Sequence, residues 1–91
     1  MFYVYIIYSH KVKKVYVGQT NDIKKRLKEH HFGRVFSTKN ILPLSLIHCE
    51  NYSTRSEAMK REKFFKSLTG SKLKHKIIEK FLADGSSKSY L

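Results

Sequence analysis

The 91-residue chain has little of several features, and each shortage excludes a class of protein. Cys49 is its single cysteine, which excludes an internal disulfide and a zinc site built from several cysteines. Its apolar runs are short, and none approaches the ~20 residues of a membrane-spanning helix. Its four glycines form no phosphate-binding loop of the Walker type. The first residues lack the basic segment of a signal peptide, so we expect a soluble protein of the reducing cytoplasm.

Acidic residues are also scarce, since seven Asp and Glu stand against 19 Lys and Arg, for a net charge of +12. A chain this basic attracts phosphate, either in nucleic acid or at an anionic membrane surface. Solubility alone requires less charge. The hydrophobic fraction of 41%, with six Phe and six Tyr, is enough to order one small core.

The apolar pattern predicts one small α+β domain. Residues 2–8 are almost all aromatic or β-branched, which is typical of a strand covered on both faces. Further strands are expected at 13–18 and 44–50, and a helix at 22–31. With two later helices, the order is β-β-α-β-α-α, a three-stranded antiparallel sheet flanked by helices. We expect residues 1–82 to form this domain and residues 83–91 to form a flexible tail.

The boundaries of the two later helices follow from capping residues. Thr54 and Glu57 fit a capping box, so a helix is expected to begin there and to continue to about Leu68. Gly70 is expected to end it. Ser71 is expected to cap a last helix that continues through residue 82.

Two tyrosines are expected to lie together on the first hairpin. If Tyr8 pairs with Lys13 across the turn, then Tyr5 pairs with Tyr16, and both phenols stand on one face near the first helix. An aromatic pair of this kind also stabilises an ordinary hairpin, so the pair alone does not indicate chemistry.

Asp22, Arg26 and His30 share one face of the first predicted helix. Arg26 could present a planar set of donors to a phosphate. The alternative is a solvated helix face with an ion pair between residues four apart.

Glu62 lies inside the apolar arc of its predicted helix, close to Ala58 and Phe65. A carboxylate in that position is unfavourable unless it is paired, protonated or bound to a metal. A structural ion pair and a functional site therefore remain equally open. Cys49 shows no nucleophile arrangement, and core packing is its expected role.

Many cations lie on or beside the predicted helices, where they could contact phosphate. A contribution to solubility alone is the alternative. The candidates for phosphate contact are Lys24, Lys25, Arg26, Lys39, Arg61, Lys72, Lys74 and Lys76.

From about residue 2 to residue 80, the chain resembles the GIY-YIG nuclease domain, and most closely its small stand-alone bacterial members. Tyr3-Val4-Tyr5 matches the first motif, although Tyr3 replaces its glycine, and Tyr16-Val17-Gly18 matches the second. Arg26, His30 and Glu62 match the helix arginine, the histidine one turn later and the metal-binding glutamate. The asparagine that some members carry after the glutamate helix has no counterpart that can be aligned.

The resemblance implies metal-assisted hydrolysis of phosphodiester bonds in DNA or RNA, with DNA as the more expected substrate. Selectivity for structure and a role in DNA repair are further expectations. Glu62 would hold Mg²⁺ or Mn²⁺, with water at the remaining positions. Tyr5 would be the general base, Tyr16 would position the water, and Arg26 would stabilise charge on the phosphate. His30 would relay a proton or contact phosphate. A monomer is expected, with a weak dimer as the alternative, and with no membrane partner.

Two other functions also fit the basic composition. One is a nucleic-acid-binding module with weak or no catalysis, and the other is a structural or ribosome-associated basic protein. The nuclease hypothesis requires Tyr5, Arg26 and Glu62 to meet at one cleft, whereas the other two require only positive charge.

Overall fold

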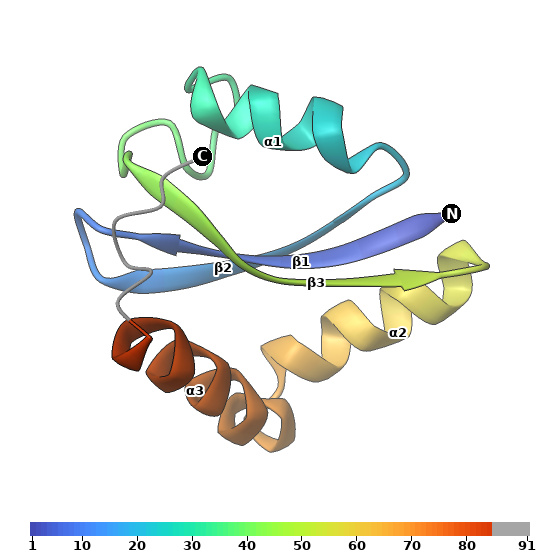
Figure 1. Ribbon diagram of the computed structural model, residues 1–91. Coiled ribbons are helices and arrows are strands. Elements are labelled where there is room, and N and C mark those ends of the chain that lie inside the picture. The colour runs from blue at the N-terminus through green and yellow to red at the C-terminus, as the bar shows by residue number, and fades with distance from the viewer. Residues whose placement is uncertain (85–91) are drawn as a thin grey trace.

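The computed structural model describes residues 1–84, which form a three-stranded antiparallel sheet and three helices. The elements are β1 (Phe2–Ser9), β2 (Lys14–Thr20), α1 (Ile23–His31), β3 (Leu44–Tyr52), α2 (Arg55–Lys66) and α3 (Leu68–Ala83). The strands are ordered β2-β1-β3, and α1 lies on one face of the sheet while α2 and α3 lie on the other (Figure 1). The predicted α+β class and element order are confirmed. Of the predicted tail, residue 83 ends α3, and residues 85–91 lie outside the described residues.

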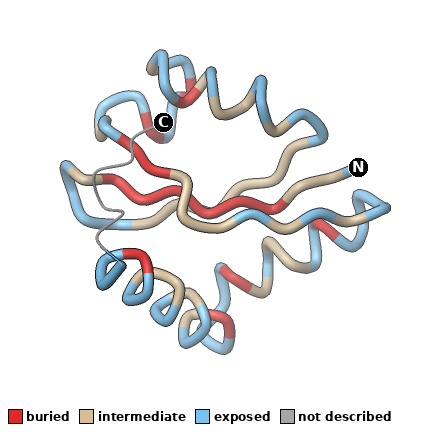
Figure 2. Tube along the Cα trace, viewed as in Figure 1, coloured by how far each residue is buried: buried red, intermediate tan, exposed pale blue. Residues whose placement is uncertain are grey.

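Because β1 is the middle strand, its side chains alternate between two cores, and six consecutive residues are buried (Figure 2). On the α2 face the buried cluster is Val4, Ile6, Ala58 and Phe65. On the α1 face it is Tyr5, Ile7 and Leu44, against which Tyr16, Ile23 and Leu27 pack. The second cluster is the floor on which the candidate site is built.

The register of the first hairpin differs from the prediction. Tyr5 pairs with Gly18, and Tyr16 pairs with Ile7, so Tyr5 and Tyr16 share a face as diagonal neighbours rather than as a direct pair. The cause lies in the turn, where the Ser9 carbonyl accepts the backbone N–H of Lys13 at 2.8 Å. Lys13 adopts a left-handed conformation with φ 56°, and strand pairing therefore continues through Ser9.

The junction between α2 and α3 also corrects the predicted boundaries. The N-cap of α3 is Ser67 rather than Ser71, since the Ser67 hydroxyl accepts the N–H of Gly70 at 3.2 Å. Gly70 lies inside the first turn of α3 and does not end α2. A Cβ there would fall on the carbonyl of Phe64, so this glycine permits close packing of the two helices.

Cys49 is exposed, which contradicts the expected core packing. Its neighbours on β3, His48 and Glu50, face α2, so Cys49 faces the opposite side of the sheet on an outer strand. Burial of part of the side chain and the charge of Glu50 raise the pKa of the Cys49 thiol, which makes it a poor nucleophile.

Candidate active site

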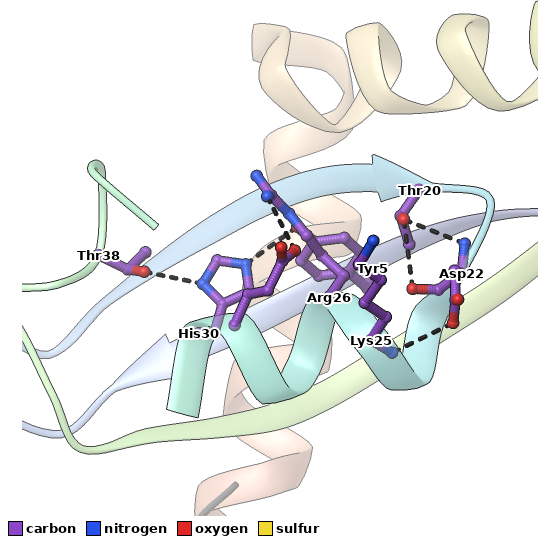
Figure 3. Close-up of polar contacts among 8 residues, drawn as sticks. Tyr5, Thr20, Asp22, Lys25, Arg26, His30 and Thr38 are labelled. Atoms are coloured by element: carbon purple, nitrogen blue, oxygen red, sulfur yellow. Dashed lines mark hydrogen bonds and ion pairs between the residues drawn. The ribbon is translucent and has the colours of Figure 1, made fainter. Parts of the chain in front are cut away.

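The hydroxyl of Tyr5 is the centre of a buried hydrogen-bonded chain (Figure 3). It lies 3.0 Å from Nε2 of His30 and 3.4 Å from Nε of Arg26. Nδ1 of His30 lies 2.7 Å from the hydroxyl of Thr38. Tyr5 and His30 are each only 3% exposed, and Thr38 is fully buried. A strand, a helix and the following loop thus contribute to one polar cluster.

The protonation of Arg26 and His30 limits which groups of this chain can donate. The Nε–H of Arg26 can only donate, so the Tyr5 oxygen accepts from it. Burial, and then the charge of Arg26, lower the pKa of His30 to about 4, so the ring is neutral at neutral pH and carries one proton. One ring nitrogen of His30 therefore donates and the other accepts, toward the hydroxyls of Tyr5 and Thr38. His30 is held between these two hydroxyls.

The capped start of α1 positions Arg26 and His30. The side chain of Asp22 accepts the backbone N–H of Lys25 at 3.1 Å, and so begins the helix at the end of β2. Arg26 and His30 then lie one turn apart and face β1. Arg26 pairs with Glu29 at 3.4 Å, while Asp22 serves as the cap. The pKa of Arg26 is raised, and the hydrogen bond from Arg26 to the Tyr5 hydroxyl is the largest cause.

Gly18 makes room for the phenol of Tyr5. A Cβ at this position would lie 2.5 Å from the Tyr5 hydroxyl, closer than side-chain atoms approach in folded proteins. The glycine that closes the second motif thus allows the Tyr5 ring to extend over β2 toward α1.

All five residues predicted to be catalytic line one cavity of about 200 Å³. They are Tyr5, Tyr16, Arg26, His30 and Glu62. Glu62 comes from α2, on the far face of the sheet, and reaches the cavity beside the edge strand β2. The cleft that the nuclease hypothesis required is therefore present.

Glu62 has the ion-pair partner that the sequence required, and it also faces the cavity. Its carboxylate lies 3.1 Å from the ammonium of Lys66, and its side chain is 22% exposed. Within residues 1–84 no group of three His, Cys, Asp or Glu side chains is placed to hold a metal. A single carboxylate at a polar cavity suits Mg²⁺ or Mn²⁺, because Mg²⁺ retains several waters and shares substrate phosphate oxygens. The donor set therefore fits a hard divalent cation.

Comparison with known proteins agrees with this geometry. The model of the GIY-YIG catalytic domain matches residues 1–76. The chain belongs to the GIY-YIG family. Similar proteins include UPF0213 protein YazA of Bacillus subtilis, 46% identical over 71% of this chain and 67% of the relative. A UPF0213 protein of Bacillus velezensis is 45% identical over 72% and 68%, and one of Haloquadratum walsbyi is 38% identical over 77% and 79%. No solved structure matches the chain.

Membership of the GIY-YIG family implies a nuclease-like function and a nucleic acid substrate. Among the described residues, no helix has the length and apolarity needed to cross a membrane.

The basic residues of this GIY-YIG domain lie on both faces of its sheet. Lys24 and Lys25 are on α1, and Lys39 is in the loop that follows it, so these three lie on the side of Tyr5 and His30. Lys72, Lys74 and Lys76 lie on α3, which covers the opposite face (Figure 1). The structure does not bring the two groups together.

Arg61 is held in an ion pair with Glu50. Its Nε and Nη2 lie 2.8 Å and 3.1 Å from the two carboxylate oxygens of Glu50. Although burial raises the pKa of Glu50, hydrogen bonds from Arg61, His48 and Tyr52 outweigh it and lower that pKa to about 2. This cluster joins β3 to α2, and contact of Arg61 with phosphate stays a prediction.

Sequence reasoning missed Thr38, which is the anchor of His30. Thr38 lies in a loop with no periodic pattern, where nothing distinguishes it from Ser37 or Asn40. Its role appears only when the loop folds back on α1 and buries the hydroxyl.

We expect the stability of the domain to fall as the pH is lowered from about 6.5 toward 4. His30 has an ordinary pKa of 6.5 when unfolded and a pKa of about 4 when folded, so only the unfolded chain binds a proton in that window. Above pH 6.5 His30 is neutral in both the folded and the unfolded chain, so the domain keeps its full stability there. Thermal melts of wild type and His30→Gln at pH 7 and pH 5 measure it, with exposed His31→Gln as control.

The loss of stability between pH 7 and pH 5 should be smaller in His30→Gln than in wild type. In His31→Gln it should equal the loss in wild type. Glu50 acts in a separate window, because its lowered pKa of about 2 weakens folding only below pH 4.5. Equal losses in all three proteins between pH 7 and pH 5 would contradict the neutral, buried state of His30.

Proposed function

We propose that this chain is a metal-dependent endonuclease that hydrolyses phosphodiester bonds in DNA. The observation that carries the proposal is the cavity in which Tyr5, Arg26 and His30 form one hydrogen-bonded chain opposite Glu62. A protein that only binds nucleic acid requires positive charge at its surface. It does not require a buried hydrogen-bonded chain of a phenol, an imidazole and a threonine hydroxyl.

Tyr5 acts as the general base on the attacking water. The phenol oxygen takes a proton from water as its own proton moves to Nε2 of His30, 3.0 Å away. In this mechanism the proton of the neutral His30 ring is on Nδ1, toward the Thr38 hydroxyl, so that Nε2 accepts. Burial, and then the charge of Arg26, lower the pKa of His30, and a bound phosphate would offset the second of these two effects.

Arg26 and Tyr16 hold the phosphate beside the water. Arg26 is the cation closest to the Tyr5 hydroxyl among the contacts of the site, so its guanidinium stabilises charge that develops on the phosphate oxygens. Tyr16 lines the same cavity and positions the water or a phosphate oxygen. Glu62 would hold a divalent cation, which would supply Lewis-acid stabilisation to the phosphate when bound.

Incubation with labelled nucleic acids tests the proposal directly. The purified protein is mixed with single-stranded, duplex and branched DNA, and with RNA of the same sequences, in Mg²⁺, Mn²⁺ or chelator. We expect cleavage of DNA that requires the metal. Binding without cleavage in every combination would favour the alternative, a nucleic-acid-binding module without catalysis.

Binding to duplex DNA should depend strongly on salt and weakly on sequence. If about five phosphates are contacted, the slope of log K against log salt concentration should be about −4 to −5. Lys25→Gln should reduce the slope by about 0.9, because Lys25 lies on α1 and lines a pocket that shares Arg26 with the cavity. For a short duplex, Lys72→Gln should leave it unchanged, because α3 lies on the opposite face. Titrations in chelator at several salt concentrations measure the slope. A slope near zero would overturn the proposed nucleic-acid interface.

A further inference from the structure

Two phenylalanine rings project into solvent from the loop that joins α1 to β3. Phe36 is 84% exposed and Phe32 is 64% exposed. Single exposed apolar side chains are common on protein surfaces, so exposure alone indicates little. Three further features distinguish Phe36 from an ordinary exposed apolar residue. They are the ordered backbone that carries it, the cation beside its ring, and the next two residues, which line the cavity.

The backbone that carries Phe36 is anchored on both sides. Val35 is 7% exposed and Thr38 is fully buried. The carbonyl of Val35 accepts the N–H groups of Thr38 and Lys39 at 3.1 Å and 2.9 Å, which closes a helical turn around Phe36. The ring is thus held outward by an ordered turn, so little conformational entropy would be lost when it contacts a ligand.

A cation accompanies each exposed ring. Nζ of Lys39 lies 4.8 Å from the centre of the Phe36 ring, and the guanidinium carbon of Arg34 lies 5.5 Å from the centre of the Phe32 ring. Cation–π contacts of this kind place a positive charge on one face of each ring. The combination of an aromatic surface with an adjacent cation suits a nucleotide, since the ring can stack on the base while the cation contacts the phosphate.

Phe36 directly precedes two residues of the candidate active site in the chain. The next two residues, Ser37 and Thr38, both line the cavity that contains Tyr5 and Glu62. Consecutive Cα atoms are about 3.8 Å apart, so Phe36 begins one residue from the cavity wall. A nucleotide whose phosphate enters the cavity would have a neighbouring base within reach of this ring.

We propose that Phe36 is a stacking site for an unpaired base beside the phosphate that enters the cavity. Paired bases are stacked on one another and present only their edges, so an aromatic ring gains a base face only where the strand is unpaired. The inference deepens the proposed function, on which it rests, because it selects nucleic acids with single-stranded nucleotides next to the cut. A blunt duplex would gain nothing from Phe36.

Binding experiments in chelator separate stacking from cleavage. The probe is a 12-nucleotide DNA strand with 2-aminopurine at one internal position, used alone and as a blunt duplex. Stacking on Phe36 should quench the fluorescence of the single strand. Phe36→Ala should weaken single-strand binding by about tenfold and abolish the protein-dependent quench, without changing the affinity for the duplex.

Matched variants distinguish stacking from apolar contact and from charge. Phe36→Trp should retain affinity and quench, whereas Phe36→Leu should behave like Phe36→Ala. Leu68→Ala, which removes a side chain that is 91% exposed on α3, should behave like wild type. The loss in Lys39→Ala should shrink as salt rises, while the loss in Phe36→Ala should persist, because stacking is not screened.

The outcomes separate this inference from the proposed function. Equal affinity and quench in wild type and Phe36→Ala would overturn the stacking site, as would a change in oligomeric state in place of a loss of binding. A wild-type protein that shows the Phe36-dependent quench and cuts no substrate in Mg²⁺ or Mn²⁺ would support the stacking site and overturn the nuclease proposal. Failure to bind single strands would overturn the stacking site.

Discussion

Tyr5→Phe is expected to lower the rate of DNA cleavage by about 10²–10⁴-fold. The substitution removes one hydroxyl and keeps the ring that packs on Ile7 and Leu44. That hydroxyl is the atom between Nε2 of His30 and Nε of Arg26, so its loss interrupts the path of the proton from water to His30. Single-turnover rates at saturating enzyme, in Mg²⁺, measure the chemical step without a contribution from product release.

The stability of Tyr5→Phe should fall slightly, because His30 loses a buried hydrogen-bond partner. The expected decrease in the free energy of unfolding is about 1 kcal/mol, which leaves the protein folded at 25 °C. A thermal melt establishes that the loss of cleavage does not arise from unfolding. Tyr16→Phe is the matched control, since it removes a phenol from the same cavity and should reduce the rate less. Wild-type rates in Tyr5→Phe, on a substrate that wild type cuts, would exclude Tyr5 as the base.

The sequence predicted those parts of the site that depend on local patterns. A continuous aromatic and β-branched run predicted a strand covered on both faces, which is β1, and the predicted helix from Asp22 corresponds to α1 with Asp22 as its N-cap. With that start fixed, helical periodicity places Arg26 and His30 on the face toward β1. Glu62 is conspicuous in the sequence because a carboxylate in an apolar arc requires a partner. In the structure it pairs with Lys66 and also lines the cavity.

Features that depend on turns and on contacts distant in sequence could not be predicted in this way. The predicted hairpin register is wrong, because the left-handed conformation of Lys13 extends β1 through Ser9. No residue pattern in the sequence indicates that conformation. Gly70 is typical of a helix terminator in the sequence, but in the structure it allows close packing against the carbonyl of Phe64. Thr38 could not be found, because its contact with His30 exists only after the loop has folded.

Glu62→Gln should abolish metal-dependent cleavage, with a loss of at least about 10³-fold, while affinity for DNA in chelator is retained. The amide keeps the shape of the side chain and removes the negative charge that attracts a divalent cation. Stability should change little, because the lost ion pair joins Glu62 to a Lys66 side chain that is 57% exposed, and surface pairs contribute about 0–1 kcal/mol. Cleavage is measured in Mg²⁺ and in Mn²⁺, and affinity in chelator.

Lys66→Gln separates the two roles of Glu62. It removes the same ion pair but leaves the carboxylate at the cavity, so cleavage in Mg²⁺ should persist in this variant and be lost in Glu62→Gln. Broadening of backbone amide signals by Mn²⁺ gives a second readout that does not depend on activity. Gly18 lines the cavity, so its signal should broaden in wild type and in Lys66→Gln but not in Glu62→Gln. Equal losses of cleavage and broadening in both variants would mean that Glu62 acts through its ion pair, and the metal role would be wrong.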